Sequence, residues 1–331
     1  MEYIDVFNGD ADGICALHQL RLQTPRPDAR LVTGVKRDIR LLARLGEVRD
    51  SEITVLDISM DRNRDALAGL LEQGNRVLYV DHHFSGDIPA SPLLTAHIDP
   101  SPQTCTSMIV DGLVHGKYRP WAVVGAFGDN LDETALQAAQ SLELGPEETD
   151  ALRETGILLN YNGYGAALDD LFFPPDVLYR AVHEFADPLE FHARSSALAR
   201  LRDGYQRDMA RAGAHGPLRE EPGCRVFRLP GEPWARRVSG VYSNILARQE
   251  PGKAHALLMP NADGSWRISV RAPLASRTGA DLLCRSFPTG GGRAAAAGIN
   301  ELPPEMLDTF LAAFSRQYAK EPPCAAHSAT P

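Results

Sequence analysis

The chain has 331 residues, of which 44% are hydrophobic and 23% are charged, and its formal net charge is −9. This length allows two domains of ordinary size, each with its own core. The negative charge argues against a surface that coats long nucleic acid by counterion release. It does not argue against a small phosphate ligand, which metal ions and a few arginines can hold locally.

The sequence contains no run of about 18 apolar residues that would span a membrane. Its opening residues lack the basic, apolar and small-residue pattern of a secretory signal. We therefore expect a cytoplasmic protein without a membrane partner. Its five cysteines show no CxxC spacing, which indicates reduced thiols and neither a zinc knuckle nor a disulfide framework. They are Cys15, Cys105, Cys224, Cys284 and Cys324.

In the first quarter of the chain, short apolar runs alternate with amphipathic segments. This alternation predicts a mainly parallel, doubly wound α/β sheet with right-handed crossovers. The expected strands lie at 3–8, 30–35 and 53–59 and within 77–83, and the expected helices lie at 13–22, 38–46 and 64–74. Asp38 is a candidate cap for the second of these helices.

The next segments are expected to be mostly helical. Residues 97–116 indicate a turn into a helix, with Thr104 or Thr106 as the N-cap. Residues 121–133 begin with an apolar run rich in small residues and end in acidic residues. We group the apolar run with the strands, because acidic residues follow it. Residues 146–213 have a mainly helical pattern.

Two features divide that helical stretch. A polar turn is expected at 160–165, and residues 188–211 resemble one amphipathic helix that bridges two halves of the protein. The pattern then changes to strands at 224–230, 254–260 and 266–273. A helix follows at 277–286.

The C-terminal region contains a glycine-rich segment at 289–298, in which three glycines precede an expected alanine helix. A last helix is predicted at 304–319. The expected organisation is therefore a doubly wound α/β domain joined by a helical linker to a smaller α+β domain. The boundaries are 1–187 for the first domain, 188–213 for the linker helix, 214–320 for the second domain and 321–331 for a disordered tail.

Acidic and histidine residues follow the predicted strands. Because the carboxyl ends of parallel strands meet at one edge of a sheet, we expect these side chains to lie close together. Extended backbone would point Asp10 and Asp12 to the same side. Carboxylates and imidazoles together suit divalent transition metals, with Mn²⁺ as a natural candidate. The residues are Asp10, Asp12, Asp57, Asp81, His82, His83 and Asp129.

These motifs resemble those of the DHH phosphoesterase superfamily, which includes RecJ-type exonucleases, nanoRNases, pAp phosphatases, cyclic dinucleotide phosphodiesterases, family II pyrophosphatases and exopolyphosphatases. The resemblance covers nearly the whole chain, and its motifs occur in the family's order. They are DADG at 10–13, Asp57, DHH at 81–83, GAFGD at 125–129, SVRAP at 269–273 and GGGRAAAAG at 290–298.

The resemblance implies a centre for two Mn²⁺ ions, with Mg²⁺ or Co²⁺ as alternatives. It implies that Asp57 bridges the ions and that Asp10 binds the first, while the second is bound by Asp12, His82 and Asp129. His83 would face the substrate phosphate, so the implied catalytic residues are Asp57, His82 and His83. Two ions about 3.5–4 Å apart can activate a shared water and neutralise phosphoryl charge during in-line attack.

The resemblance also implies a substrate-binding surface in the second domain, across a cleft from the metals. Its implied residues are Arg271, Gly290, Gly291, Gly292 and Arg293. Arg271 on an alternating strand is otherwise a solvated edge residue. The glycines are otherwise a flexible turn, although a helix opening after them would offer backbone N–H groups to an anion.

The sequence departs from the family pattern at two places. Many members have a His four residues before the first Asp of the opening motif, where this chain has Val6, with Asn8 as the nearest polar residue. We therefore expect the first ion to be held weakly. Arg293 stands where the C-terminal signature usually has a His, and arginine binds phosphate but does not exchange a proton near neutral pH.

Several other residues have a structural interpretation beside a functional one. Lys36 and Arg37 are interpreted as an exposed basic pair, with phosphate contact as the alternative. The aromatic and amide groups near 160–165 are interpreted as a turn, with base stacking as the alternative. The residues of that turn are Tyr161, Asn162 and Tyr164. The remaining candidates are assigned to structural positions: His18 and His115 to packing or the surface, and Asp132 and Glu133 to a helix N-terminus.

The leading functional hypothesis is an Mn²⁺-dependent phosphoesterase that acts on a short nucleotide substrate, such as an oligonucleotide end, a cyclic dinucleotide or a nucleoside bisphosphate. A second hypothesis is a hydrolase of polyphosphate or pyrophosphate, which uses the same metal chemistry. A third is a catalytically weak nucleotide-binding regulator, suggested by Val6 and Arg293. The expected partner is a small phosphate-containing or short nucleic-acid substrate, and a homodimer is left open.

Overall fold

The computed structural model describes residues 2–318 and consists of two compact units, Met1–Tyr205 and Gln206–Pro331. The division falls within helix α9 (Ser196–Gly213). The predicted tail at 321–331, residue 319 of the predicted last helix and Cys324 lie outside the described residues.

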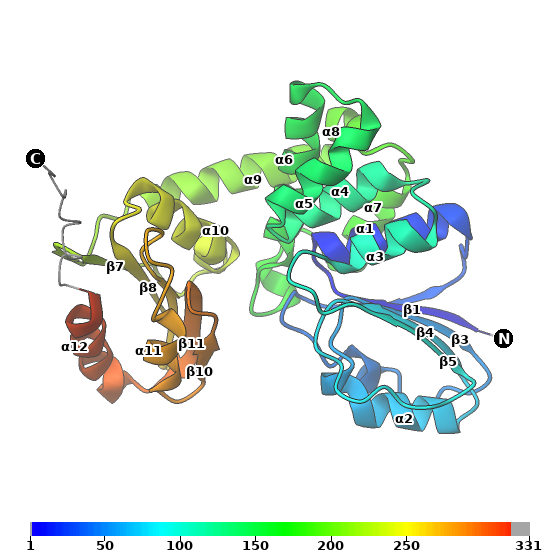
Figure 1. Ribbon diagram of the computed structural model, residues 1–331, viewed down its shortest axis with the longest axis horizontal. Helices are drawn as coiled ribbons and strands as arrows, with labels where there is room; N and C mark the ends of the chain where they lie inside the picture. Colours follow the sequence, from blue (N-terminus) through cyan, green and yellow to red (C-terminus); the bar gives the residue numbers. More distant parts are fainter. Residues whose placement is uncertain (1, 319–331) are drawn as a thin grey trace, which may run out of the picture. The chain divides into compact units, whose positions relative to one another are not determined.

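The first unit contains a five-stranded parallel sheet with the order β2-β1-β3-β4-β5. Its helices lie on both faces, with α2 on one face and α1, α3 and α4 on the other (Figure 1). This arrangement confirms the predicted doubly wound α/β class. The strands are β1 (Tyr3–Phe7), β2 (Arg30–Val32), β3 (Glu52–Leu56), β4 (Arg76–Asp81) and β5 (Leu94–Ile98).

Most of the sequence between β5 and the second unit is helical, and further helices connect the earlier strands. The α-helices are α1 (Ala11–Gln23), α2 (Arg64–Glu72), α3 (Thr106–Leu113), α4 (Arg119–Gly128), α5 (Asp132–Ala139), α6 (Pro146–Gly163), α7 (Pro175–His183) and α8 (Pro188–Arg194). The 3-10 helices are η1 (Leu41–Arg44), η2 (Asp61–Asn63), η3 (Gln140–Leu142) and η4 (Leu168–Asp170). Beneath the sheet, Val6, Val55 and Tyr79 pack against Leu41 and Leu67 in a buried core.

The run 121–128 is helical, which corrects its grouping with the strands. It forms most of α4, and all of its residues are buried. A run that is apolar on every side has no period that separates a buried helix from a buried strand. Asp129 therefore follows a helix and not a strand.

The predicted polar turn at 160–165 is also wrong, because α6 continues to Gly163. The Asn162 side chain is buried inside the unit, where it bonds the backbone of Phe172 and Phe173. Tyr161 is fully buried against Phe172 and Tyr205, so it offers no stacking platform to a base. The polar side chains of this segment make hydrogen bonds within the unit.

Three smaller expectations also change. Residues 188–211 form two helices, α8 and α9, because Ser195 between them has an extended ψ of 119°. The predicted helix at 38–46 is reduced to η1, and Asp38 accepts from Arg44 at 2.9 Å instead of capping it. Strand β5 was not predicted, since this partly exposed edge strand has no continuous apolar run, and its last two residues fall in the expected turn that begins at residue 97.

The second unit contains a mixed six-stranded sheet with the order β10-β11-β9-β8-β7-β6. Only β7 and β8 run parallel among the described pairs. Its strands are β6 (Arg219–Glu221), β7 (Cys224–Arg228), β8 (Ala254–Pro260), β9 (Trp266–Arg271), β10 (Gly290–Gly292) and β11 (Ala296–Leu302). Its helices after α9 are α10 (Pro233–Gln249), α11 (Ala280–Arg285), η5 (Pro304–Met306) and α12 (Leu307–Tyr318).

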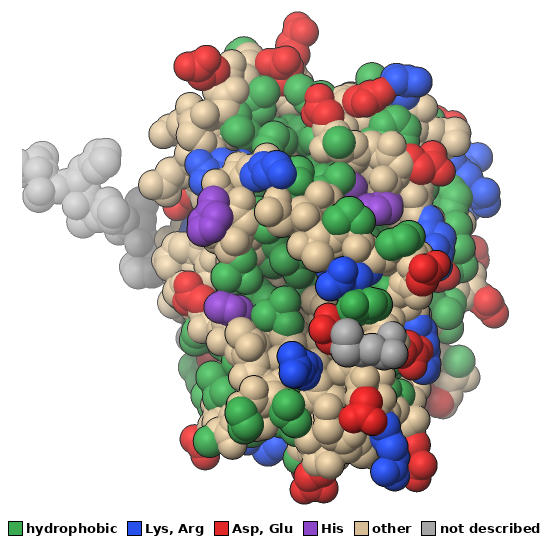
Figure 2. Space-filling model, turned by 90° about the vertical axis from the view of Figure 1, so that its right-hand side faces the viewer, with side chains coloured by type: hydrophobic (Ala, Val, Ile, Leu, Met, Phe, Trp, Pro, Cys, Tyr) green, Lys and Arg blue, Asp and Glu red, His purple; other side chains and the backbone are tan. Residues whose placement is uncertain are grey.

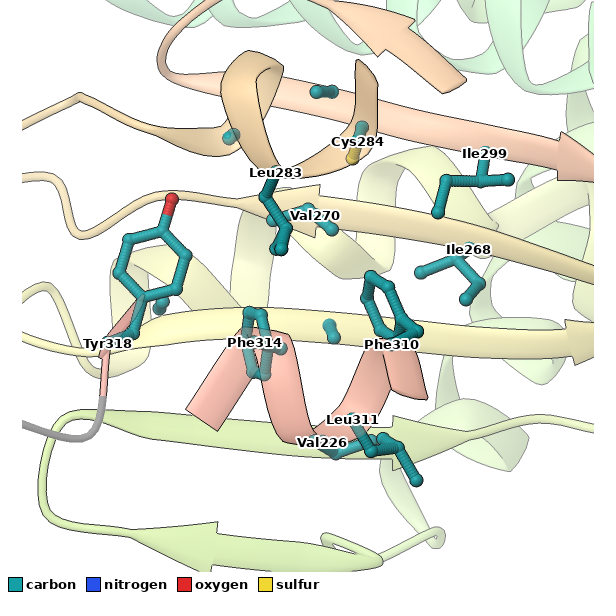
Figure 3. Close-up of a cluster of buried hydrophobic side chains, with 14 of the residues drawn as sticks. Val226, Ile268, Val270, Leu283, Cys284, Ile299, Phe310, Leu311, Phe314 and Tyr318 are labelled. Atoms are coloured by element: carbon teal, nitrogen blue, oxygen red, sulfur yellow. The ribbon is translucent and has the colours of Figure 1, made fainter. Parts of the chain in front are cut away.

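Helix α12 confirms the predicted last helix and closes the core of this unit. Phe310 and Phe314 point from α12 toward Ile268 and Val270 of the sheet (Figure 3). Helix α10 was not predicted, although its buried residues carried the signal. Trp234, Val238, Tyr242 and Leu246 are spaced by four and are all buried.

Of the four alanines after the three glycines, Ala296 and Ala297 begin β11 and the first two lie in the turn before it, which corrects the predicted helix. Residues 290–292 pair with β11 as a hairpin. A Cβ on Gly290 would lie 1.8 Å from the carbonyl oxygen of Cys284. Gly292 has a φ of +138°, and a Cβ there would lie 2.4 Å from the Cα of Ala297. The glycines therefore permit close backbone packing, and they do not precede a helix N-terminus.

Figure 2 shows the face of the first unit on the side where β1 begins. Acidic and basic side chains are interspersed over this face. A pocket of about 690 Å³ lies at the strand starts and is lined in part by Tyr3, Glu52 and Val77. No helix among residues 2–318 has the length and apolar character needed to cross a bilayer.

Candidate metal centre

The acidic and histidine residues gather at the carboxyl end of the parallel sheet. In the order β2-β1-β3-β4-β5, the connections change direction between β1 and β3. Such a switch point leaves a crevice for a ligand at the carboxyl ends of the strands. Asp10 follows β1, Asp57 follows β3, and His82 follows β4.

Asp57 has a left-handed backbone conformation, with φ at +59°. Its backbone N–H donates to the carbonyl of Val80 at 3.1 Å, directly after β3 ends. Its buried carboxylate accepts from the Thr106 hydroxyl at 3.2 Å and lies 3.4 Å from His82 Nε2. A non-glycine residue with positive φ costs free energy, and such residues concentrate at functional sites.

The backbone does not stay extended from Asp10 to Asp12, because Asp10 is extended but α1 begins directly after it, and this corrects the geometric argument for their shared side. Asp10 is the N-cap of α1 and accepts from the N–H of Gly13 at 3.1 Å, while Asp12 lies in the first turn. The Asp12 carboxylate accepts from the N–H groups of Thr106 and Ser107, each at 2.8 Å. It thereby caps α3 from a distant part of the chain, a role that the sequence analysis had given to Thr104 or Thr106.

His82 is oriented by a single backbone contact. Its Nδ1 lies 3.1 Å from the carbonyl oxygen of Thr104, so Nδ1 must carry the proton to donate there. This tautomer leaves the Nε2 lone pair available to a metal ion. Nε2 lies 3.4 Å from an oxygen of Asp57 and 3.8 Å from an oxygen of Asp129.

His83 is held by the fully buried Asp81. Its Nδ1 donates to Asp81 at 2.7 Å, and 43% of its side chain is exposed. Burial lowers the pKa of His83, but the hydrogen bond and charge of Asp81 outweigh burial and raise the pKa above its ordinary value. His83 therefore favours the protonated form more than a free imidazole does.

Two groups of side chains have ligand atoms within 4.8 Å of one another: Asp12, His82 and Asp129, and Asp57, His82 and His83. Both groups combine carboxylate oxygen with imidazole nitrogen, which suits Mn²⁺. His82 belongs to both groups. The structure therefore brings together the predicted ligands Asp12, Asp57, His82 and Asp129.

The electrostatics of these carboxylates also fit a cation. Burial raises the pKa of Asp57 well above its ordinary value, and the charges of Asp10 and Asp12 raise it further. Burial and the charges of Asp12 and Asp10 also raise the pKa of Asp129, although Lys36 opposes them. Buried like charges destabilise one another. A divalent ion among them would relieve that repulsion, so the donor set fits a metal.

Lys36 lies inside this centre, which corrects its interpretation as part of an exposed basic pair. Its Nζ donates to Asp10 at 2.5 Å, to Asp129 at 3.1 Å and to Asn160 at 3.2 Å. Burial raises the pKa of Asp10, but Lys36 and the N–H of Gly13 outweigh burial and lower it overall. The sequence marked Lys36 only as one of a basic pair and Asn160 only as part of a polar segment, because only the fold brings them to Asp10.

The departure from the family pattern at Val6 has a structural correlate. Val6 is fully buried in the core beneath the sheet. The Asn8 side chain accepts from the N–H of Asp10 at 3.3 Å, and its amide donates to the carbonyl of Lys36 at 3.2 Å. Asn8 therefore braces the loop that carries Asp10.

In the second unit, the register places the predicted residues near one end of the sheet. Arg271 ends β9 opposite Ala296, and Gly292 lies opposite Ala297. The Arg271 guanidinium donates to Asn244 of α10 at 2.7 Å. Arg293 is exposed in the turn between β10 and β11. A Cβ on Gly291 would meet no atom within 4 Å, unlike one on Gly290 or Gly292.

The residues assigned to structural positions are found there. His18 is buried against Trp121, His115 is exposed at the end of α3, and Asp132 and Glu133 lie in the first turn of α5. Among the described residues all the cysteines are unpaired and buried, as expected of reduced thiols.

Comparison with known proteins gives structural matches only. Neither a protein-family model nor a curated protein sequence matches the chain. The structure is similar to a DHH-domain protein described as a member of a family of ribosomal proteins, with a TM-score of 0.63, 13% identity and coverage of 96% of this chain and 86% of that one.

Two similar structures have more specific descriptions. One is exonuclease RecJ bound to manganese, with a TM-score of 0.61, 17% identity and coverage of 97% of this chain and 91% of that one. The other is PggH, a pGpG-specific phosphodiesterase from Vibrio cholerae, with a TM-score of 0.55, 13% identity and coverage of 96% and 98%. With its parallel sheet and mixed second sheet, the chain therefore has the same fold as these DHH-domain and RecJ structures.

Proposed function

We propose that the chain is a metal-dependent phosphoesterase that hydrolyses a phosphate ester of a short nucleotide, with Mn²⁺ as the ion. One observation carries this proposal. The ligand atoms of Asp12, His82 and Asp129 converge within 4.8 Å, and the contact of His82 with Thr104 leaves its Nε2 free to bind a metal. When bound, a divalent ion supplies Lewis-acid chemistry that polarises phosphate and activates water.

The residues of this chain hold the ion and orient the substrate. Asp12 is fixed by two N–H groups of α3, and His82 by one carbonyl, so neither ligand needs to reorganise on binding. Asp57 brings a further carboxylate to the same edge of the sheet.

We assign a substrate-facing role to His83. Asp81 holds its Nδ1, and the partial exposure of the side chain leaves Nε2 available to donate to a phosphate oxygen. The raised pKa of His83 favours the donor form. This role would make binding of an anionic substrate depend on the Asp81–His83 pair.

The second unit is proposed to bind the substrate through Arg271, Arg293 and the glycines Gly290, Gly291 and Gly292. Arg271 is oriented by Asn244, and a guanidinium can bind phosphate with two parallel hydrogen bonds. Gly291 adds no side chain that would keep a ligand from the backbone. We therefore expect Arg271→Ala to raise KM more than it lowers kcat.

The nucleotide class is supported by the neighbours in fold. One is described as an exonuclease bound to manganese, and another as a phosphodiesterase specific for pGpG. The net charge of −9 favours a small substrate over long nucleic acid.

The test is product release by the purified chain with Mn²⁺, offered pApA, linear and cyclic di-AMP, pAp and polyphosphate. We expect one nucleotide to be hydrolysed selectively, and we expect Asp57→Asn to abolish turnover while the circular dichroism spectrum is unchanged. The matched control is Asp65→Asn on the exposed side of α2, which should keep full turnover.

Other outcomes would replace the proposal. Turnover of polyphosphate alone would make the chain a polyphosphate hydrolase. No turnover, with a nucleotide that still raises the melting temperature, would make it a nucleotide-binding regulator. An unchanged rate in Asp57→Asn would contradict the assigned site.

A further inference from the structure

Lys36 is fixed in place by its own backbone before its side chain begins. Its N–H donates to the carbonyl of Gly163 at 2.9 Å. Its carbonyl accepts from the amide of Asn8 at 3.2 Å. The residue is therefore tied both to the end of α6 and to the loop after β1, unlike a lysine on a free surface.

The ammonium group of Lys36 has three N–H donors, and the structure provides three oxygen acceptors for them. These belong to Asp10, Asp129 and Asn160, at 2.5, 3.1 and 3.2 Å. Asn160 is itself oriented, because its amide donates to the Tyr164 hydroxyl at 3.2 Å. The ring of Tyr164 also lies 5.7 Å from the ammonium. The amino group is thus surrounded like a bound cation.

The same contacts already give Asp10 a cationic partner, unlike Asp12, whose two oxygens accept from neutral backbone N–H groups. One oxygen of Asp10 accepts from the N–H of Gly13, and the other accepts from Lys36. A hard divalent ion binds carboxylate oxygen at about 2.1 Å. An ion on the remaining lone pair of the second oxygen would lie beside the Lys36 ammonium, whose positive charge would repel it.

The surrounding residues add no replacement ligand. Val6 packs in the core, and both ends of the Asn8 amide bond the backbone. Asp10 belongs to neither convergent group, since one consists of Asp12, His82 and Asp129 and the other of Asp57, His82 and His83. The two groups share His82.

We propose that the Lys36 ammonium takes the place of one of the two cations that the family resemblance implies, so that this centre binds one divalent ion at Asp12, His82 and Asp129. The inference rests on the metal centre of the proposed function and not on its turnover. A lysine charge is part of the chain, so a chelator cannot remove it. Asp10 and Asp129 therefore keep a cationic partner in the metal-free protein.

The test counts Mn²⁺ ions per chain in the metal-free protein after dialysis against increasing Mn²⁺, with electron paramagnetic resonance as a second readout. We expect one ion per wild-type chain and the spectrum of an isolated Mn²⁺. In Lys36→Met, the uncompensated carboxylates of Asp10 and Asp129 should admit a second ion, and the spectrum should become that of an exchange-coupled pair. Arg37→Met, which changes the exposed neighbour, should keep one ion.

Asp10→Asn provides a second variant in case Lys36→Met does not fold. Asparagine retains the N-cap of α1, and one ion should still bind because Asp10 is not its ligand. Loss of an ion in Asp10→Asn, or two coupled ions in the wild type, would overturn the inference. Turnover is measured in the same samples. Two ions with turnover would leave the proposed function intact, whereas one ion without turnover would leave only the inference intact.

Discussion

Asp57 combines two features that cost stability. Its φ of +59° lies in a region that non-glycine residues rarely adopt. Its buried carboxylate is close enough to Asp10 and Asp12 for their charges to raise its pKa. Cation-binding sites retain such destabilising features, because the bound ion neutralises the repulsion between the carboxylates and is needed for function.

We therefore predict that Asp57→Asn stabilises the metal-free protein while it abolishes turnover. A raised folded-state pKa means that ionised Asp57 destabilises the fold at any pH above its unfolded pKa of about 3.8, so the neutral amide should stabilise the fold at pH 7.5. Asparagine also tolerates the left-handed backbone.

The measurement is thermal unfolding in a chelator, where Asp57→Asn should have a higher melting temperature than the wild type. A lower melting temperature in Asp57→Asn would contradict the repulsion. Adding Mn²⁺ serves as the control, since the wild type should then gain more than the variant.

His18 is the second residue with a clear consequence for stability. Its Nε2 donates to the carbonyl of Phe185 at 2.9 Å, so its Nδ1 must accept from His183 at 3.1 Å. Burial lowers the pKa of His18 to about 3, from an ordinary 6.5. The folded protein therefore holds this imidazole neutral.

Between pH 6.5 and pH 3 the unfolded chain binds a proton at His18 that the folded chain does not. Stability from this residue is complete above pH 6.5 and is lost as the pH falls. From pH 7.5 to pH 5 the loss should be about 2 kcal/mol. Urea unfolding at the two pH values should show that His18→Gln loses less stability than the wild type, by about that amount. Equal losses of unfolding free energy in the two proteins would contradict the prediction.

At the scale of elements, the centre depends on how closely α4 approaches α1 and α3. The small residues predicted to allow close packing do so, since a Cβ on Gly125 would lie 2.2 Å from Ser107 Oγ and 3.3 Å from an oxygen of Asp12. Gly128 is similarly close to Ala11 of α1, at 2.3 Å. Helix α4 thus fixes both the position of Asp129 and the capping of α3 by Asp12.

We predict that Gly125→Ala destabilises the first unit by about 1–3 kcal/mol, because the added methyl group overpacks the contact with Ser107. The displaced Asp12 should also weaken Mn²⁺ binding, which titration of the variant would measure. The matched control is Gly112→Ala in α3, where a Cβ meets no atom within 4 Å. That variant should gain up to about 1 kcal/mol from helix propensity, and equal behaviour of the two variants would contradict the packing argument.

For the whole molecule, the two compact units divide the proposed tasks. Every proposed metal ligand lies in Met1–Tyr205, and the proposed substrate arginines Arg271 and Arg293 lie in Gln206–Pro331. A ligand that binds only the native state stabilises it by mass action, by about 2.7 kcal/mol at 100 times Kd. Metal and nucleotide should therefore protect different parts of the chain.

We predict that Mn²⁺ slows amide hydrogen exchange in the starts of α1 and α3 and in the loop after β3, because these segments carry or brace the ligands. The strands β8 and β9 should show no direct change with Mn²⁺ alone. Exchange measured by mass spectrometry with and without chelator would test this. Protection that is greatest in β8 and β9 would place the metal in the wrong unit.

The sequence by itself determined the alternation of strands and helices in the first unit, the last helix and most residues of the candidate metal centre. Asp57, His82 and His83 follow strands, and a parallel sheet brings the carboxyl ends of its strands to one edge whatever the strand order. Those predictions depend only on local pattern and on a general property of parallel sheets.

Only the tertiary structure decided the remaining features, because they depend on contacts between distant segments. The run before Asp129 is a helix that is buried on every side, so its pattern has no period that reveals it. The glycines at 290–292 form a strand that pairs with β11, and Cys284 and Ala297 leave no room for a Cβ at Gly290 and Gly292. Lys36 joins the centre because the fold places it 2.5 Å from Asp10 and 3.2 Å from Asn160. A lysine after a strand carries no local sign of such partners, since its long side chain is equally suited to solvent.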